Sequence, residues 1–129
     1  MARQKLFVIL GASGAFLSVA LGAFGAHSLK AVLSPELHAT FETAVRYQMY
    51  HSLALLVVGV LVMRISHRSL VVAGWLFVWG IALFSGSLYC LSLTRATWLG
   101  FVTPIGGVLF LAGWAFLVAG ILKSQRLTS

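Results

Sequence analysis

Four long apolar stretches in this chain limit its possible folds more than any other feature. They cover residues 6–26, 44–63, 70–91 and 101–122. Each is long enough to cross about 30 Å of hydrocarbon as a helix, which takes roughly 20 residues. Only 9% of the 129 residues are charged, whereas soluble domains have about 25%. The sequence therefore predicts one transmembrane domain, spanning residues 1–129, with four membrane-crossing helices.

Short connections join the later stretches. RISHRS joins the second stretch to the third, and SLTRATWLG joins the third to the fourth. Short connections make neighbouring helices antiparallel. The predicted fold class is therefore an all-α membrane protein, with the four transmembrane helices in an antiparallel bundle.

The first stretch also shares features with a secretory signal peptide, because MARQK supplies a basic start and AFG precedes Ala26. Its apolar run of about 20 residues exceeds the roughly 7–15 residues typical of a signal peptide. Its removal would also leave three spans and place the two ends of the chain, with their charges, on opposite sides of the membrane. We expect the stretch to be retained as the first transmembrane helix.

Lysine and arginine residues flanking the stretches predict the orientation in the membrane, because cytoplasmic flanks carry the excess of positive charge. Six of these residues would lie on one side and three on the other: Arg3, Lys5, Arg64, Arg68, Lys123 and Arg126 against Lys30, Arg46 and Arg95. We therefore expect both termini to be cytoplasmic, with the protein in a bacterial inner (plasma) membrane.

The second helix has a recognisable start outside the apolar stretch. Ser34, Pro35 and Glu36 are the residue types favoured at a helix N-cap, at the first helical position and near the positive end of the helix dipole. No helix-breaking residue follows before Gly59. We expect one helix over residues 35–63, whose first two or three turns form an amphipathic extension at the outer membrane surface.

Polar side chains gather in the outer half of all four predicted helices. This cluster consists of His27, Glu42, Arg46, Tyr47, Gln48, Tyr50, His51, Ser85, Ser87 and Thr103. Ionisable residues inside a membrane are costly, so they face neighbouring helices or a wet cavity. Glu42 and Arg46 are four residues apart in the favourable order, which predicts an ion pair. The cluster either joins helices through hydrogen bonds or forms a pocket for a ligand.

Small residues recur at helical spacing in the first and fourth stretches. Gly11, Ala15, Ser18, Gly22 and either Gly25 or Ala26 form one stripe, and Gly106, Gly113 and Gly120 recur every seven residues. Such stripes let helix backbones approach closely. The tryptophans Trp75, Trp98 and Trp114 are typical of membrane interfaces or cores and do not by themselves indicate a site.

Several function classes are excluded or disfavoured by composition. The net charge of +7 is scattered over nine basic residues that form no tract, so we expect no nucleic-acid partner. The single Cys90 cannot form an intramolecular disulfide, a CxxC pair or a cysteine-based zinc site. His27 and His51 would lie at different depths, which disfavours binding of one haem between them. We expect no metal, no cofactor, no catalytic residues and no enzymatic activity.

Two hypotheses for the function remain. The first is a non-enzymatic accessory, scaffold or small-ligand-binding protein whose outer polar cluster contacts membrane lipids, a partner membrane protein or a second copy of the chain. The second is a small transporter or channel component that uses Glu42, Arg46 and His51. Proton- or cation-coupled transporters usually have a carboxylate inside a span, whereas Glu36 and Glu42 both lie near the outer edge. The sequence therefore disfavours the second hypothesis while leaving a proton relay through Glu42, Arg46 and His51 open.

Four segments together resemble a family of small bacterial membrane proteins of unknown function, which includes the YgdD-like and YwdK-like proteins. They are LGAFGAHSLK (21–30), FETAVRYQMYHSLALL (41–56), LFSGSLYCLSL (83–93) and TPIGGVLFLAGW (103–114). The resemblance extends in order and spacing over nearly the whole chain. It implies a four-span inner-membrane protein and supplies no activity, substrate or cofactor.

Overall fold

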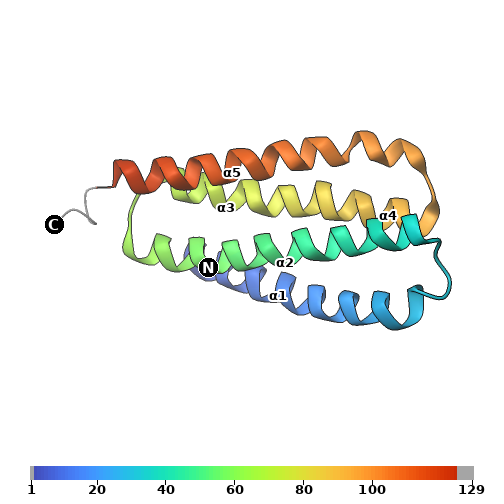
Figure 1. The fold of residues 1–129 in the computed structure, drawn as a ribbon. Helices are drawn as coiled ribbons and strands as arrows, with labels where there is room; N and C mark the ends of the chain where they lie inside the picture. Colours follow the sequence, from blue (N-terminus) through green and yellow to red (C-terminus); the bar gives the residue numbers. More distant parts are fainter. Residues whose placement is uncertain (1, 125–129) are drawn as a thin grey trace.

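The computed structural model describes residues 2–124, and every regular element within this range is helical. Four long helices lie side by side (Figure 1), and each is long and apolar enough to cross a membrane. They span Arg3–Leu29, Pro35–Arg64, Arg68–Thr94 and Thr97–Lys123. The protein is an all-α membrane protein, and the predicted fold class is confirmed.

Three of the four long helices change their hydrogen-bonding pattern along their length. The elements follow one another as α1 (Arg3–Phe24), the π-helical turn η1 (Gly25–Leu29), α2 (Pro35–Arg64), α3 (Arg68–Gly80), the π-helical turn η2 (Ile81–Ser85), α4 (Gly86–Thr94), the 3₁₀ turn η3 (Thr97–Phe101) and α5 (Thr103–Lys123). The π-helical turns were not predicted. The first helix also runs past residue 26, because residues 26–29 contain no helix breaker and Leu29 is buried.

Helix α2 begins where the sequence predicts. The Ser34 hydroxyl accepts a hydrogen bond from the backbone N–H of Leu37 at 3.3 Å, and Pro35 follows at the first position of the helix. The helix then continues for 30 residues, about 45 Å at 1.5 Å per residue. Its first turns are amphipathic, since Phe41 is buried in the bundle while Glu36 is exposed.

The fourth long helix packs on the third through a ladder of glycines. A side-chain Cβ at Gly106 would collide with the backbone of Phe84, and one at Gly113 would lie 2.6 Å from the Phe77 ring. Gly120 faces Leu70 in the same way, at 2.7 Å. Both partners of this ladder therefore repeat every seven residues, and the predicted glycine stripe of the fourth stretch lies in a helix contact.

Glycines also bring α1 and α2 together. A Cβ at Gly11 would lie 2.7 Å from the carbonyl oxygen of Ser52, and one at Gly59 would lie 2.7 Å from the Val8 side chain. Gly11 and Ser18 of the predicted stripe are buried. The bundle thus consists of two closely packed pairs, α1 with α2, and α3–α4 with α5.

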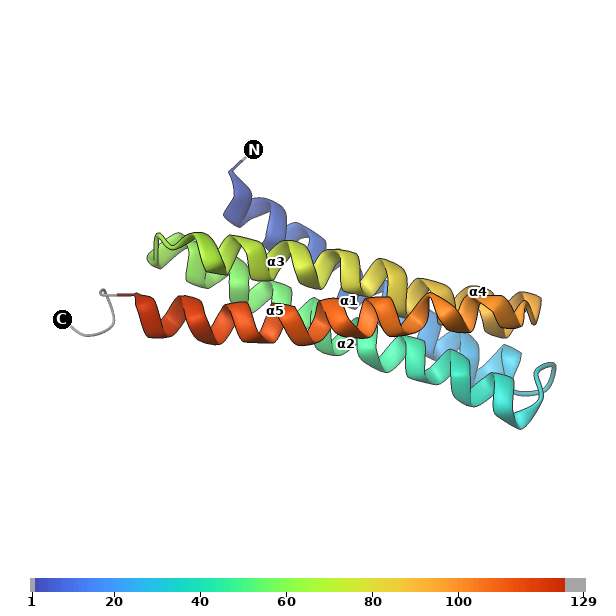
Figure 2. The same ribbon diagram turned by 90° about the horizontal axis from the view of Figure 1, so that it is seen from above.

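Large apolar side chains fill the space between the two pairs. Phe7, Leu55, Val58 and Phe77 are each no more than 1% exposed. Phe7 lies against Gly74 and stacks edge-on with Trp75 at a centroid distance of 5.4 Å, which connects α1 to α3. Helix α1 crosses the other helices at an angle (Figure 2), so it does not follow α3–α4 closely along its whole length.

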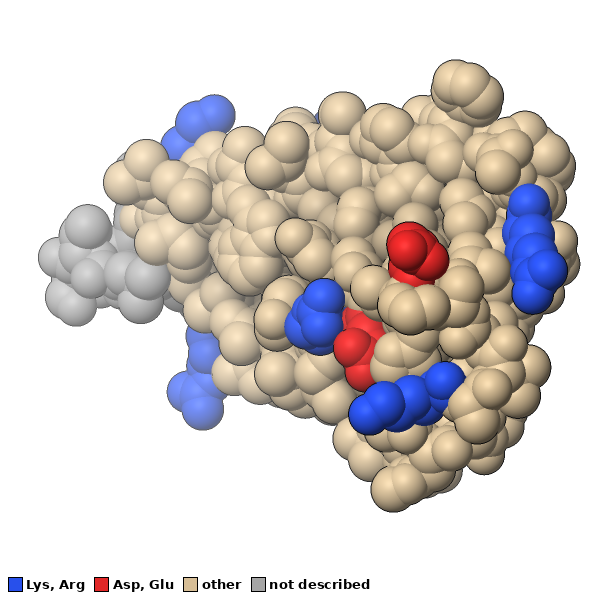
Figure 3. Space-filling model, turned by 45° about the vertical axis from the view of Figure 1, so that its right-hand side comes forward, with Lys and Arg blue, Asp and Glu red and all other residues tan. Residues whose placement is uncertain are grey.

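Charged side chains mark the two ends of the bundle. Helix α1 begins and α5 ends at the end that carries the α2–α3 connection, whereas the α1–α2 and α4–α5 connections lie at the opposite end (Figure 1). That opposite end, called the outer end after the orientation that the sequence predicts, holds both acidic residues among several Lys and Arg side chains (Figure 3). Arg126 of the predicted basic side lies outside the described residues.

The glycine ladder predicts unequal effects for two adjacent glycines of α5. Gly106→Ala should lower the free energy of unfolding by about 1–3 kcal/mol, because its methyl group overlaps the Phe84 backbone. Gly107→Ala should have no destabilising effect, since its Cβ meets the Phe84 ring only at 3.9 Å. Reversible unfolding in mixed detergent micelles measures both values. Equal effects at the two positions would contradict the ladder.

Candidate functional site

Gln48 links three helices in the outer half of the bundle. Its side-chain amide donates to the backbone carbonyl of Gly14 in α1 at 2.9 Å. Its side-chain carbonyl accepts from the hydroxyl of Tyr89 in α4 at 2.6 Å. The Tyr89 ring packs edge-on against Phe41 at a centroid distance of 5.1 Å. A single residue of α2, itself 5% exposed, therefore joins α1 to α4.

Serine hydroxyls form the next contacts of the cluster. Ser85, the last residue of η2, donates to the carbonyl of Ala44 in α2 at 2.7 Å. The hydroxyls of Ser87 and Thr103 lie 2.6 Å apart and join α4 to the start of α5. These bonds satisfy hydroxyl groups that would otherwise lie unpaired in an apolar medium. They are side chain-to-backbone and side chain-to-side chain bonds within the protein.

His51 lies on a different face of α2 and contacts α5. Its Nδ1 lies 2.8 Å from the carbonyl of Tyr47, and its Nε2 lies 3.0 Å from the indole Nε1 of Trp114. A carbonyl can only accept and an indole N–H can only donate, so Nδ1 carries the proton and Nε2 is the acceptor. The ring also stacks on Phe110 at 3.6 Å. Both ring nitrogens of a neutral imidazole are therefore occupied.

Glu42 and Arg46 do not form the predicted ion pair with each other. The Glu42 carboxylate lies 3.8 Å from Nε2 of His38, and the same Nε2 lies 3.0 Å from the carbonyl of Gly25. Arg46 is exposed and donates instead to the Thr43 hydroxyl at 3.3 Å. The spacing allows the predicted pair, but each residue has another partner within one turn of α2.

The structure brings some of the predicted cluster together and leaves other residues outside it. Gln48, His51, Ser85, Ser87 and Thr103 all bond to another helix or to their own turn. Tyr47 contacts Phe84 with its ring at 4.7 Å, while Tyr50 is 53% exposed. His27 is exposed within η1 and does not join the cluster.

A groove of about 340 Å³ lies beside Gln48, between α1 and the η2–α4 segment. Its wall is mostly apolar, and Leu17 on its rim is 51% exposed. Its polar atoms come from Ser13, Gln48, Ser85 and Tyr89. The groove therefore opens sideways between helices, at the height where the polar cluster lies.

Two hydrogen-bond partners in this region were not predicted from the sequence. Trp114 was interpreted as an ordinary aromatic, and Tyr89 was not included in the cluster, although each donates to a cluster residue. The sequence pattern around one residue does not reveal a partner that is distant along the chain, and His51 and Trp114 are 63 residues apart. The π-helical turn η2, which lines the groove, also has no marked sequence signal.

Within the described residues, no group of three His, Cys, Asp or Glu side chains could hold a metal ion. The same part of the chain has one buried polar side-chain atom without a hydrogen-bond partner, the Ser52 hydroxyl oxygen. Ser52 is fully buried where α1 crosses α2, facing Gly14. Apart from Ser52, the buried polar side chains of the described residues therefore have hydrogen-bond partners within the protein.

These contacts predict opposite outcomes for two buried serines. Ser85→Ala should lower the free energy of unfolding in detergent by about 1 kcal/mol, because it removes the bond to Ala44. Ser52→Ala should not lower it, since the lost hydroxyl has no partner within residues 2–124. A destabilising Ser52→Ala combined with a neutral Ser85→Ala would refute this assignment.

Comparison with known proteins identifies relatives along nearly the whole chain. A UPF0382 membrane protein of Staphylococcus epidermidis is 51% identical over 120 residues, covering 93% of this chain and 98% of the relative. The UPF0382 membrane protein YwdK of Bacillus subtilis is 48% identical over 121 residues, with the same coverage of both chains. No solved structure shows a significant match.

The family described as "Protein of unknown function (DUF423)" matches residues 21–107, which include the whole of α2, α3, η2 and α4. This match and the relatives confirm the resemblance that the four sequence segments indicated. The chain therefore belongs to the DUF423 family, and its relatives in these bacteria are called membrane proteins.

Proposed function

We propose that this protein is a non-enzymatic binding or scaffold protein of the plasma membrane, and that it holds the acyl chain of a membrane lipid in the groove between α1 and η2–α4. The observation that carries the proposal is the groove itself, which is apolar, opens sideways and lies at the polar cluster. Lipid is the surrounding solvent of transmembrane helices, so an apolar lateral groove meets acyl chains first.

The polar atoms beside the groove support a lipid with a polar group at this height. The bond to Gly14 uses one of the two N–H groups of Gln48, and the Tyr89 oxygen keeps lone pairs after donating to Gln48. An ester carbonyl or hydroxyl of a lipid could use this remaining capacity. Leu10, Leu17 and Ile81 of the apolar wall would then contact the acyl chain of the same lipid.

The arrangement of ionisable groups does not favour the transporter hypothesis. Glu42 and Arg46 lie beside a small outer cavity of about 170 Å³, whereas His51 faces α5 with both ring nitrogens occupied. The three residues therefore do not line one path. Towards the other end of the bundle, Phe7 and Val58 are fully buried in the core between the helix pairs.

The orientation belongs to the same proposal. Arg3, Lys5, Arg64, Arg68 and Lys123 lie on one side of the four spans, against Lys30, Arg46 and Arg95 on the other. This excess supports cytoplasmic termini, because basic residues near the span ends are retained in the cytoplasm. The groove and the polar cluster would then lie in the outer leaflet.

Photo-cross-linking tests the proposed lipid site. The full-length protein is reconstituted in phosphatidylethanolamine–phosphatidylglycerol vesicles that contain a small fraction of phospholipid with a diazirine in one acyl chain. We expect groove residues such as Leu10 and Ile81 to be labelled in higher yield than Leu111, which is 73% exposed on α5 and serves as the bulk-lipid reference. Peptide mass spectrometry measures the yields.

A groove-filling variant makes this test sharper. Gly86→Leu should abolish the excess labelling, because a Cβ at Gly86 meets no other atom within 4 Å and the new side chain can occupy the groove. The control Ala12→Leu adds the same side chain at an exposed position of α1 outside the groove lining. Uniform labelling of all lipid-facing residues, or unchanged groove labelling in Gly86→Leu, would contradict the proposal.

A further inference from the structure

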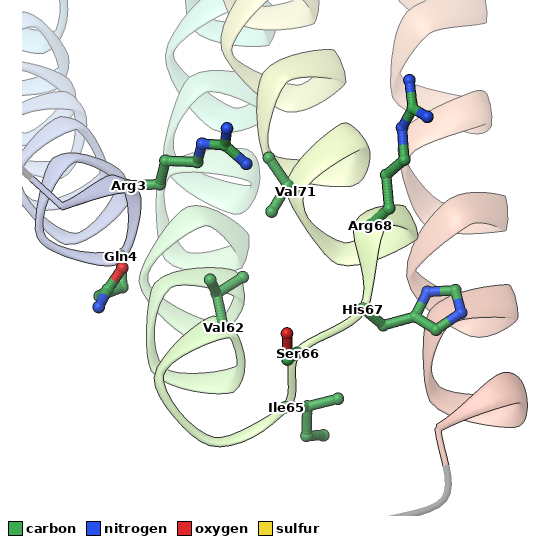
Figure 4. A pocket seen from close by; sticks show the side chains of 8 residues that line it. All are labelled: Arg3, Gln4, Val62, Ile65, Ser66, His67, Arg68 and Val71. Carbon is green, nitrogen blue, oxygen red and sulfur yellow. The ribbon is translucent and has the colours of Figure 1, made fainter.

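A further cavity, of about 550 Å³, lies at the opposite end of the bundle from the polar cluster. It is bounded by the beginning of α1, the end of α2 and the first turn of α3 (Figure 4). Val62 and Val71 provide apolar wall, while Arg3, Gln4, Ser66 and Arg68 provide polar groups. This end cavity shares no lining residue with the outer groove.

Packing contacts fix the walls of the end cavity. A Cβ at Gly59 would lie 3.1 Å from the carbonyl oxygen of Gln4, so α2 holds the start of α1 at close range. Ile65, at 3% exposure, anchors the α2–α3 connection in the core. The Nδ1 of His67 accepts from the backbone N–H of Ser69 at 3.1 Å and caps α3. The cavity is therefore formed by helix ends that pack against one another.

The end cavity carries positive charge that no acidic side chain of the protein neutralises. The chain has only two acidic residues, Glu36 and Glu42, and both belong to the outer part of α2. Within residues 2–124, neither Arg3 nor Arg68 forms an ion pair. Figure 4 shows the Arg3 side chain extending from α1 towards Val71 of α3, whereas the Arg68 side chain extends from the first turn of α3 on the side of α5.

We propose that the end cavity binds the phosphate group of an anionic membrane phospholipid. A guanidinium group binds phosphate oxygens with two parallel hydrogen bonds, which favours Arg3 as the main ligand. Gln4 and Ser66 add neutral donors, and Arg68, at the first turn of α3, adds positive charge to this end of the bundle. Basic pockets between transmembrane helices at the headgroup level are suited to such lipids.

The apolar wall favours a lipid over a free phosphate ion. Val62 and Val71 lie on the side of the cavity towards the membrane-spanning parts of α2 and α3, where the glycerol and first methylene groups of a bound lipid would pack. A free ion has no group to cover this wall. The proposal does not depend on the lipid site in the outer groove.

Native mass spectrometry of the full-length protein in detergent tests the proposal. Phosphatidylglycerol and phosphatidylcholine of the same chain length are titrated against the wild type and two double variants. Arg3→Gln/Arg68→Gln removes two charges from the cavity, whereas Lys5→Gln/Lys123→Gln removes two charges at the same end outside its lining. Helical content by circular dichroism checks that both variants fold.

We expect the Kd for phosphatidylglycerol to rise about tenfold in the cavity variant and to change little in the control, because only the first loses charge-assisted hydrogen bonds. Arg68→Lys, which keeps the charge, should retain most of the affinity. Wild-type protein should bind phosphatidylcholine more weakly. If both double variants lost the same affinity for phosphatidylglycerol, the binding would come from non-specific attraction between the lipid and the positive charge at this end, and the proposal would be wrong.

Inorganic phosphate distinguishes the two sources of the phosphate group. Added in the same titration, it should fail to displace phosphatidylglycerol, because it lacks the apolar part that covers the two valines. Displacement at concentrations similar to those of the lipid would keep the phosphate site and assign it to a free anion. Equal affinity of the wild type for phosphatidylcholine and phosphatidylglycerol would overturn the assignment to an anionic lipid.

Discussion

The side chain of Gln48 is the contact on which the arrangement of the outer half depends. Glycine contacts hold α1 to α2 and α5 to α3–α4, but they leave the two pairs to be joined by side chains. Gln48 donates to Gly14 of α1 and accepts from Tyr89 of α4, so it fixes the distance between the pairs. In a membrane, where water cannot compete, such bonds fix the positions of the helices.

The groove follows from the same arrangement. Towards the end where α1 begins, Phe7 fills the gap between α1 and α3, whereas in the outer half a polar bridge spans it. The π-helical turn η2 adds to this, because it carries Ser85 to the Ala44 carbonyl and also lines the groove. Extra residues in π-helical turns are frequent at functional sites. The residues whose hydrogen bonds join the helices therefore also line the proposed lipid site.

The sequence predicted the helices better than it predicted the partners of their polar side chains. Hydropathy and the Ser34–Pro35 start are local signals, and they located four helices and the extension of α2. Partners depend on rotation and crossing angle, which two π-helical turns altered. His27 lies in one of these turns, η1, and is exposed. The His51–Trp114 hydrogen bond could not be predicted, because Trp114 lies in an apolar stretch and its neighbours in the sequence do not indicate which residue accepts from its indole N–H.

A double-mutant cycle on Gln48 and Tyr89 tests most directly whether the outer polar residues fasten the helix pairs. The free energy of unfolding in mixed micelles is measured for the wild type, Gln48→Leu, Tyr89→Phe and the double variant. Because of the Gln48–Tyr89 hydrogen bond, we expect the losses of unfolding free energy in the two single variants to add up to about 1 kcal/mol more than the loss in the double variant. Strict additivity of the two losses would contradict it.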